Sequence, residues 1–121
     1  MNTVSRTGNR NRHLPAFLLL LLRAGPAHGA ALKARLDDML PRLAIEAGAI
    51  YRALRELEAR GALVSNWDRV ESGQARRIYT ITDIGQEELA CWHRDICQRR
   101  QALQIFLDLY EQGADHDAAA G

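Results

Sequence analysis

The fold is decided by the stretch GAIYRALRELEARGALV, residues 48–64, which is followed by SNWDRVESGQARRIYTIT, residues 65–82. In the first stretch, apolar residues recur at steps of three and four: Ile50, Leu54 and Leu57. This spacing is typical of a helix with one buried face. Gly61, directly after Arg60, suits the left-handed conformation that commonly ends a helix. The pattern therefore predicts an amphipathic helix that passes into an extended segment almost without a loop.

The second stretch predicts a β-hairpin. Two strand candidates, Leu63–Val70 and Arg76–Ile81, are separated by a polar turn in which Gly73 can take a positive φ. A helix that exposes arginines and is followed by a basic hairpin is the arrangement of a winged helix-turn-helix, in which the helix enters the DNA major groove and the wing contacts the backbone. The expected DNA-binding residues are Gly48, Ala49, Tyr51, Arg52, Arg55, Arg69, Arg76 and Arg77.

The residues before this stretch supply the other helices of such a domain. Pro15 suits the first turn of a helix, and the residues that follow it are apolar almost all round, which predicts a buried first helix. A second helix begins at Ala27 or His28 and ends before Pro41. Its expected inward stripe is Ala31, Leu32, Leu36, Met39 and Leu40. We expect His28 to make a structural hydrogen bond at the helix start rather than to act as a ligand.

A long helix is predicted after the hairpin, over residues 83–111, with Thr82 or Asp83 as its N-cap. Apolar residues recur along it at spacings of three, four or seven: Leu89, Trp92, Ile96, Leu103, Phe106 and Tyr110. A stripe of this length exceeds the core that a chain of this size offers, so we expect it to pack on a second copy. The sequence therefore predicts a homodimer with these six residues in its interface.

The two ends of the chain differ in charge and carry no periodicity. Residues 1–13 contain arginines and no acid, and they are expected to form a flexible basic arm. Residues 112–121 carry acids and neither lysine nor arginine, and they are expected to form a disordered acidic tail. The formal charge of +1 over 121 residues gives no case for nucleic acid by composition alone, so that case depends on where the charges lie.

Several other classes of protein are disfavoured by the sequence. The leucine-rich run 17–22 is far short of the ~20 residues that span a bilayer, which indicates a cytoplasmic protein without a membrane partner. The histidines and cysteines suggest no metal-ligand cluster, and neither a nucleophile motif nor a phosphate-binding glycine loop is present, so we expect neither a cofactor nor an enzyme. Cys91 and Cys97 are about 9 Å apart along a helix axis, too far for a disulfide, and whether either is redox-active stays open.

The chain resembles the PadR family of bacterial transcriptional regulators. The resemblance rests on Gly48-Ala49-Ile50-Tyr51-Arg52-Ala53-Leu54-Arg55-Glu56-Leu57-Glu58, Gly61, Arg77-Ile78-Tyr79-Thr80-Ile81-Thr82, Gly85 and, upstream, His28-Gly29. The chain departs from the family pattern at three places: Glu46-Ala47 before the glycine, Ala30 after His-Gly, and Gln74-Ala75 in the wing. The resemblance implies a DNA-binding repressor. It also implies a small aromatic or phenolic effector that binds near Trp92, Ile96 and Arg99. The other interpretation of Trp92 is that it only packs in the dimer interface.

We therefore expect a mainly α protein with a small β-hairpin (α+β), in which residues 14–82 form a winged-helix domain ahead of the dimerisation helix. Its expected partners are double-stranded DNA, a second copy and the small effector, and its expected function is regulation of a near-palindromic operator. The alternative is a winged-helix module that binds a protein partner, motivated by the weak net charge and the acidic tail. The exposed arginines of the helix after Gly48 also have an alternative interpretation. Arg52 and Glu56, and Arg55 and Glu58, have the spacing of ion pairs on a solvent-exposed helix face that does not bind DNA.

Overall fold

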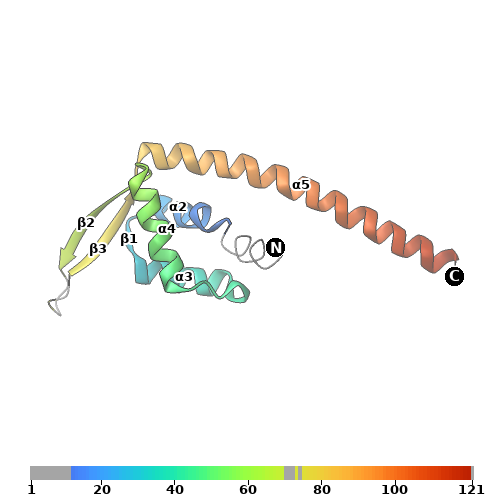
Figure 1. Ribbon diagram of the computed structural model, residues 1–121, viewed down its shortest axis with the longest axis horizontal. Helices are drawn as coiled ribbons and strands as arrows, with labels where there is room; N and C mark the ends of the chain where they lie inside the picture. The colour runs from blue at the N-terminus through green and yellow to red at the C-terminus, as the bar shows by residue number, and fades with distance from the viewer. Residues whose placement is uncertain (1–11, 70–72, 74, 121) are drawn as a thin grey trace. The chain divides into compact units, whose positions relative to one another are not determined.

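The computed structural model describes residues 12–69, 73 and 75–120 (Figure 1). Its elements, in chain order, are α2 (Leu14–Arg23), β1 (Ala27–His28), α3 (Gly29–Met39), the 3-10 turn η1 (Pro41–Leu43), α4 (Ala47–Ala59), β2 (Leu63–Arg69), β3 (Ala75–Ile81) and α5 (Asp83–Ala120). The chain divides into two compact units between Leu89 and Ala90. The first unit is a winged helix-turn-helix, so the predicted fold is confirmed.

The core of the first unit lies where α4 packs against α2 and α3. Helix α2 is buried almost all round, as its composition predicts, and Pro15 lies in its first turn. The largest fully buried side chains are Leu18, Leu19, Leu22, Leu32, Leu36, Ile50, Leu54, Leu57 and Leu63. The set includes the three α4 residues that the spacing places on a buried face. Ile45, in the turn before α4, is buried as well.

The predicted stripe of α3 is correct at its centre and wrong at its end. Leu32 and Leu36 are fully buried, but Met39 is 44% exposed. Met39 is the last residue of α3, and Leu40 leaves helical geometry with φ −134°. The periodic pattern therefore continues past the point at which the helix has a partner to pack against.

The sheet has three antiparallel strands in the order β1-β3-β2, one more than the sequence predicts. In β1, Ala27 pairs with Tyr79 and His28 with Ile78. A strand of two residues is too short to show an alternating pattern, so nothing in the sequence distinguishes it from a turn. Helix α3 accordingly begins at Gly29, and the His28 Nδ1 caps it by accepting a hydrogen bond from the Ala31 N–H at 3.2 Å. The expected structural role of His28 is confirmed.

The end of α4 and the start of α5 are joined by a compact set of contacts, which we call the α4–α5 junction: Arg60, Gly61, Ala62, Thr82, Gly85 and Glu88. Gly61 has φ +84°, the left-handed conformation expected there. The Thr82 hydroxyl donates to the Gly61 carbonyl at 2.6 Å and accepts from the Gly85 N–H at 3.1 Å, so Thr82 is the N-cap. The Arg60 guanidinium makes a bidentate pair with the Glu88 carboxylate, and this hydrogen bonding raises the pKa of Arg60.

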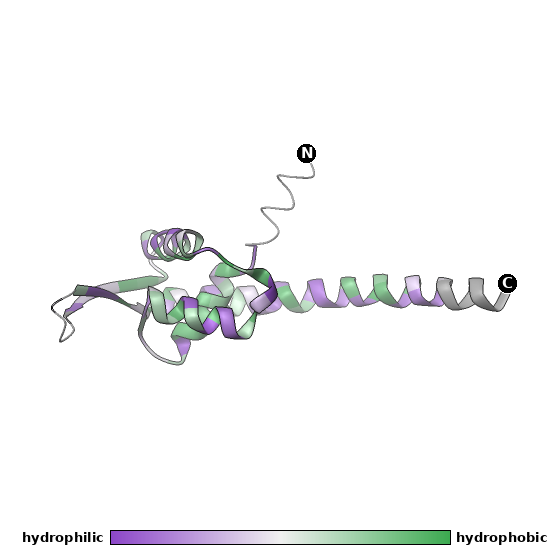
Figure 2. Ribbon diagram, turned by 90° about the horizontal axis from the view of Figure 1, so that it is seen from below, coloured by the Kyte–Doolittle hydropathy of each residue, from purple (hydrophilic) through white to green (hydrophobic). Residues whose placement is uncertain are grey.

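Helix α5 runs to Ala120, so the predicted end at residue 111 and the prediction of a disordered segment over 112–120 were wrong. The alanines of this segment are strong helix formers, and the prediction did not take their helix propensity into account. Apolar and polar residues follow one another along the helix (Figure 2). The expected flexible arm falls largely on residues 1–11, outside the described residues. Among the helices of the described residues, none combines the length and the hydrophobicity that a membrane-spanning segment requires.

Candidate nucleic-acid interface

Helix α4 presents one face to the core and the opposite face to solvent. Gly48, Tyr51, Arg52 and Arg55 are exposed, at the spacing that places them on the face away from Ile50 and Leu54. Ala49 is only 8% exposed because it lies on the core face. Of the residues predicted on this helix, four therefore form a continuous outer face, and Ala49 supports that face from beneath.

Tyr51 is held in place by the start of α3. A Cβ added at the buried Gly29 would lie 2.4 Å from Tyr51 Cε1, so the ring occupies the space that any larger residue would need. The tyrosine nevertheless remains 40% exposed. This contact explains the glycine of the His28-Gly29 pair and gives Tyr51 a fixed position on the outer face.

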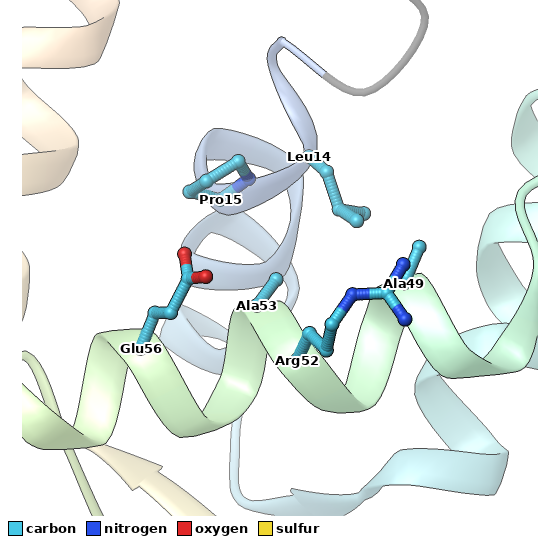
Figure 3. A pocket seen from close by; sticks show the side chains of 6 residues that line it. All are labelled: Leu14, Pro15, Ala49, Arg52, Ala53 and Glu56. Atoms are coloured by element: carbon cyan, nitrogen blue, oxygen red, sulfur yellow. The ribbon is translucent and has the colours of Figure 1, made fainter. Parts of the chain in front are cut away.

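Arg52 lies along α4 beside a shallow pocket of about 170 Å³. The pocket is lined by Leu14 and Pro15 of α2 and by Ala49, Arg52, Ala53 and Glu56 of α4 (Figure 3). The Arg52 guanidinium extends toward the N-terminal end of α4, where a Cβ added at Gly48 would lie 3.4 Å from Arg52 Nη1. Typical small-molecule sites enclose about 300 Å³ or more. We therefore read this pocket as the border of the outer face rather than as a ligand site.

The two wing arginines lie on opposite faces of the hairpin, since successive strand residues alternate. The Arg77 Nε donates to Ser65 Oγ at 2.7 Å, and the guanidinium carbon lies 5.0 Å from the centroid of the Trp67 ring. Ser65 Oγ in turn donates to Glu58 Oε2 of α4 at 2.7 Å, and Arg77 Nε lies 4.0 Å from the other carboxylate oxygen. Arg77 is therefore held by internal partners.

Arg76 is less firmly held. Its Nη1 lies 3.0 Å from His28 Nε2, while His28 Nδ1 accepts from the Ala31 N–H. A neutral imidazole has one acceptor nitrogen, so both contacts cannot be full hydrogen bonds at once. Arg76 is accordingly the wing arginine with more capacity for an external acceptor. The third predicted wing residue, Arg69, pairs with Ala75 through its backbone, and its side chain lies outside the described residues.

Tyr79 joins the α4 surface to the hairpin. Its side chain is buried, and burial raises the pKa of its phenol. Arg77 and Arg55 lower that pKa and Glu58 raises it, so charges from α4 and β3 surround one ring. Because Glu58 of α4 accepts from Ser65 and lies near Arg77, the outer side of α4 and the Arg77 face of the hairpin are adjacent.

The α5 residues predicted for dimerisation differ in exposure. Leu103, Phe106 and Tyr110 are each about two-thirds exposed, and the rings of Phe106 and Tyr110 stack with centroids 6.3 Å apart. Leu89 and Trp92 are half-buried. Three further apolar residues are exposed beside the stripe and were missed by the spacing argument: Ile105, Leu107 and Leu109. Arg99, the candidate effector residue, donates to Asp95 at 2.8 Å.

The cysteines of α5 have polar neighbours. Cys97 Sγ lies 3.6 Å from His93 Nε2, one helical turn away, whereas Cys91 accepts from Arg94 at 3.2 Å. The His93 and Cys97 side chains thus meet, as residues four apart on one helix can. Within the described residues, no group of three or more histidine, cysteine or acidic side chains could hold a metal ion.

Comparison with known proteins gives a consistent result. Residues 18–91 match the model of the transcriptional regulator PadR-like family. The chain is 35% identical over 94 residues to the transcriptional regulator Rv3488 of Mycobacterium tuberculosis, covering 78% of each chain. It is similar to a PadR family transcriptional regulator of Eggerthella lenta, at 34% identity, a TM-score of 0.66 and coverage of 84% of this chain and 89% of that one.

It is also similar to PadR of Bacillus subtilis, whose structure was solved in complex with operator DNA, at 26% identity and a TM-score of 0.62. That match covers 68% of this chain and 47% of the Bacillus protein. The chain therefore spans about half the length of this DNA-bound relative.

Proposed function

This chain belongs to the PadR-like family of transcriptional regulators, and on that premise we propose that it is a sequence-specific DNA-binding repressor. The observation that carries the proposal is the outer face of α4, where Tyr51, Arg52 and Arg55 are exposed on a helix whose other face is fully buried. A helix held rigidly in this way can enter the major groove without losing its core contacts. The complex of the Bacillus relative with operator DNA supports DNA binding by this chain.

The proposed contacts divide into two kinds. Arg52 and Arg55 can each donate two hydrogen bonds to a guanine edge, which reads sequence, whereas Arg76 of the wing supplies a phosphate contact, which gives affinity without sequence preference. Gly48 has no side chain and lets the helix backbone approach the DNA closely.

The proposal includes a homodimer on a near-palindromic operator. Leu103, Phe106 and Tyr110 are exposed apolar side chains on one stripe of α5, and a second copy of the same helix presents the same stripe in return. A two-fold dimer would address two half-sites about 34 Å apart, one turn of DNA. The most detailed part of the proposal is that a small aromatic effector binds the protein and causes it to leave the operator. It rests on the family resemblance and on the position of Trp92, Ile96 and Arg99 within the same helix.

The dimer can be tested by adding charge to the stripe. The variant Leu103→Glu, Phe106→Glu is expected to raise the dimer dissociation constant by about a hundredfold or more, because each buried apolar side chain contributes roughly 1.5–3 kcal/mol. Sedimentation equilibrium measures the constant. The matched control is Gln98→Glu, Gln101→Glu, which adds the same charge at exposed polar positions of α5. A dimer that survives the first pair as well as the second would exclude this stripe as the interface.

The function itself is tested by DNA binding at increasing salt. The purified protein is expected to bind DNA from immediately upstream of its own coding region more tightly than unrelated DNA, because a sequence-specific regulator must contact bases. The logarithm of its binding constant should fall linearly with the logarithm of the salt concentration, with a slope of about −0.9 for each phosphate that the protein neutralises. Absence of DNA binding at every salt concentration would contradict the proposal and favour the protein-interaction module. Adding phenolic compounds to the same assay tests release by an effector.

A further inference from the structure

The wing carries a large aromatic side chain in an exposed position. Trp67 of β2 is 65% exposed, although it lies on the same face of the strand as the fully buried Leu63. Ser65 lies between them on that face and is half-buried, so exposure rises step by step along the strand toward the wing tip. The alternation of the strand fixes this face, and the core ends before Trp67 is reached. Its indole therefore has to find contacts outside the domain or remain in water.

The ring is held from across the hairpin. Trp67 is paired in register with Arg77, and the guanidinium of Arg77 lies over the ring, 5.0 Å from its centroid. Arg77 is itself fixed, because its Nε donates to Ser65 Oγ at 2.7 Å. One ring face is thus covered by a cation whose own position is determined, and most of the ring still faces solvent. A ligand that binds Trp67 therefore causes only a small loss of conformational entropy, because the indole is already oriented in the free protein.

The same contacts connect the wing with α4. Ser65 Oγ donates to the Glu58 carboxylate, and Glu58 lies one turn after Arg55 on the outer side of the helix. The Trp67 face of the hairpin is therefore the face that looks toward α4, whereas Arg76 and His28 lie on the other face. A DNA duplex lying against the outer face of α4 would therefore run past the Trp67 face of the hairpin.

We propose that Trp67 contacts the sugar-phosphate backbone of DNA beside the major groove that α4 occupies, and that Arg77 positions it. This inference rests on the proposed function. The apolar ring matches the C–H surface of a deoxyribose, and the indole N–H can donate to a phosphate oxygen. Arg77 is on this reading a positioning residue, and Trp67 is the group that contacts the DNA.

Fluorescence quenching provides a direct test, because the chain contains two tryptophans. In a Trp92→Phe background, the emission comes from Trp67 alone. Duplex DNA from immediately upstream of the coding region, added to saturation, is expected to lower the acrylamide quenching constant of Trp67 at least about twofold. The matched control is Trp67→Phe, which reports Trp92 and shows how much quenching changes away from the wing. Equal quenching of Trp67 with and without bound DNA would overturn the proposal.

Affinity measurements separate contact from positioning. Trp67→Ala is expected to weaken binding about fivefold or more, as truncation of a contacting tryptophan commonly does, and Trp67→Phe should recover much of the loss. Arg77→Ala should weaken binding, raise the quenching of Trp67 in the free protein, and have little additional effect when combined with Trp67→Ala. Additive losses would show that Arg77 contacts DNA independently and would overturn its positioning role.

The outcomes distinguish this inference from the function it rests on. If the wild-type protein fails to bind any DNA, the proposed function and this inference both fail. If the wild type prefers the upstream DNA while Trp67→Ala binds it with unchanged affinity, the function stands and the role of Trp67 is rejected. Preferential binding together with protection of Trp67 supports both.

Discussion

Replacing Arg52 and Arg55 together by alanine is expected to reduce affinity for the operator by about a hundredfold or more. Each arginine that reads a guanine edge contributes about 1–3 kcal/mol of discrimination, and two such contacts on one helix face contribute roughly twice that. Both side chains are exposed on the outer face of α4, so their removal leaves the buried residues Ile50 and Leu54 untouched. Fluorescence anisotropy with labelled DNA measures the loss, and circular dichroism checks that the fold persists.

A matched variant removes the same charge elsewhere. Arg23→Ala, Arg100→Ala alters two exposed arginines, one at the end of α2 and one on α5, and is expected to change affinity only by the loss of general electrostatic attraction. If both double variants bind alike, α4 does not read the DNA. If affinity for operator and for unrelated DNA falls equally in the α4 variant, Arg52 and Arg55 contact phosphates rather than bases.

Replacing Gly85 by alanine is expected to destabilise the winged-helix unit by about 1 kcal/mol. A Cβ at this position would lie 2.2 Å from the Ala62 carbonyl oxygen and 2.6 Å from Ile81 Cγ1. Neither the backbone oxygen nor the strand residue can move away without disturbing the α4–α5 junction, and overpacking of this kind typically costs about 1–3 kcal/mol. The gain in helix propensity from glycine to alanine, about 1 kcal/mol, only partly offsets the clash. Urea denaturation measures the difference.

The same helix supplies the control. Gly113 of α5 has no atom within 4 Å of an added Cβ. Gly113→Ala therefore gains helix propensity without a clash, and it is expected to leave the protein as stable as the wild type or slightly more stable. Equal stability of the two alanine variants would show that the α4–α5 junction tolerates a methyl group at residue 85, contrary to the geometry described above.

The sequence predicts a helix or strand best where the local backbone preferences of the residues and the pattern of buried side chains indicate the same element. Helix α4 is of this kind, because its apolar spacing and its terminal Gly61 both indicate the same boundaries. The two long strands are also correct, since each has several residues over which alternation can be read. Strand β1 was missed because two residues carry no periodicity, and its pairing with β3 depends on contacts distant in sequence.

The candidate site was predicted with less detail than the fold. Residue types and positions on α4 identify Tyr51, Arg52 and Arg55 as exposed, but spacing alone does not reveal that Ala49 is turned to the core. The sequence also treats Arg76 and Arg77 as equivalent wing residues. Their difference arises from partners elsewhere in the chain, His28 for one and Ser65 for the other, and such pairings become visible only when the strands are in register.

The opposite orientation of Arg76 and Arg77 also limits how such a chain can change in length. An insertion between Arg69 and Ala75 leaves the pairing of β2 with β3 intact, so extra residues can accumulate there over evolutionary time. A one-residue insertion or deletion in β3 ahead of Arg76 shifts the register and turns every later side chain to the other face. Tyr79 would then leave the core, and the two arginines would exchange partners. Variation in length should therefore be confined to the wing tip, while the strand lengths stay constant.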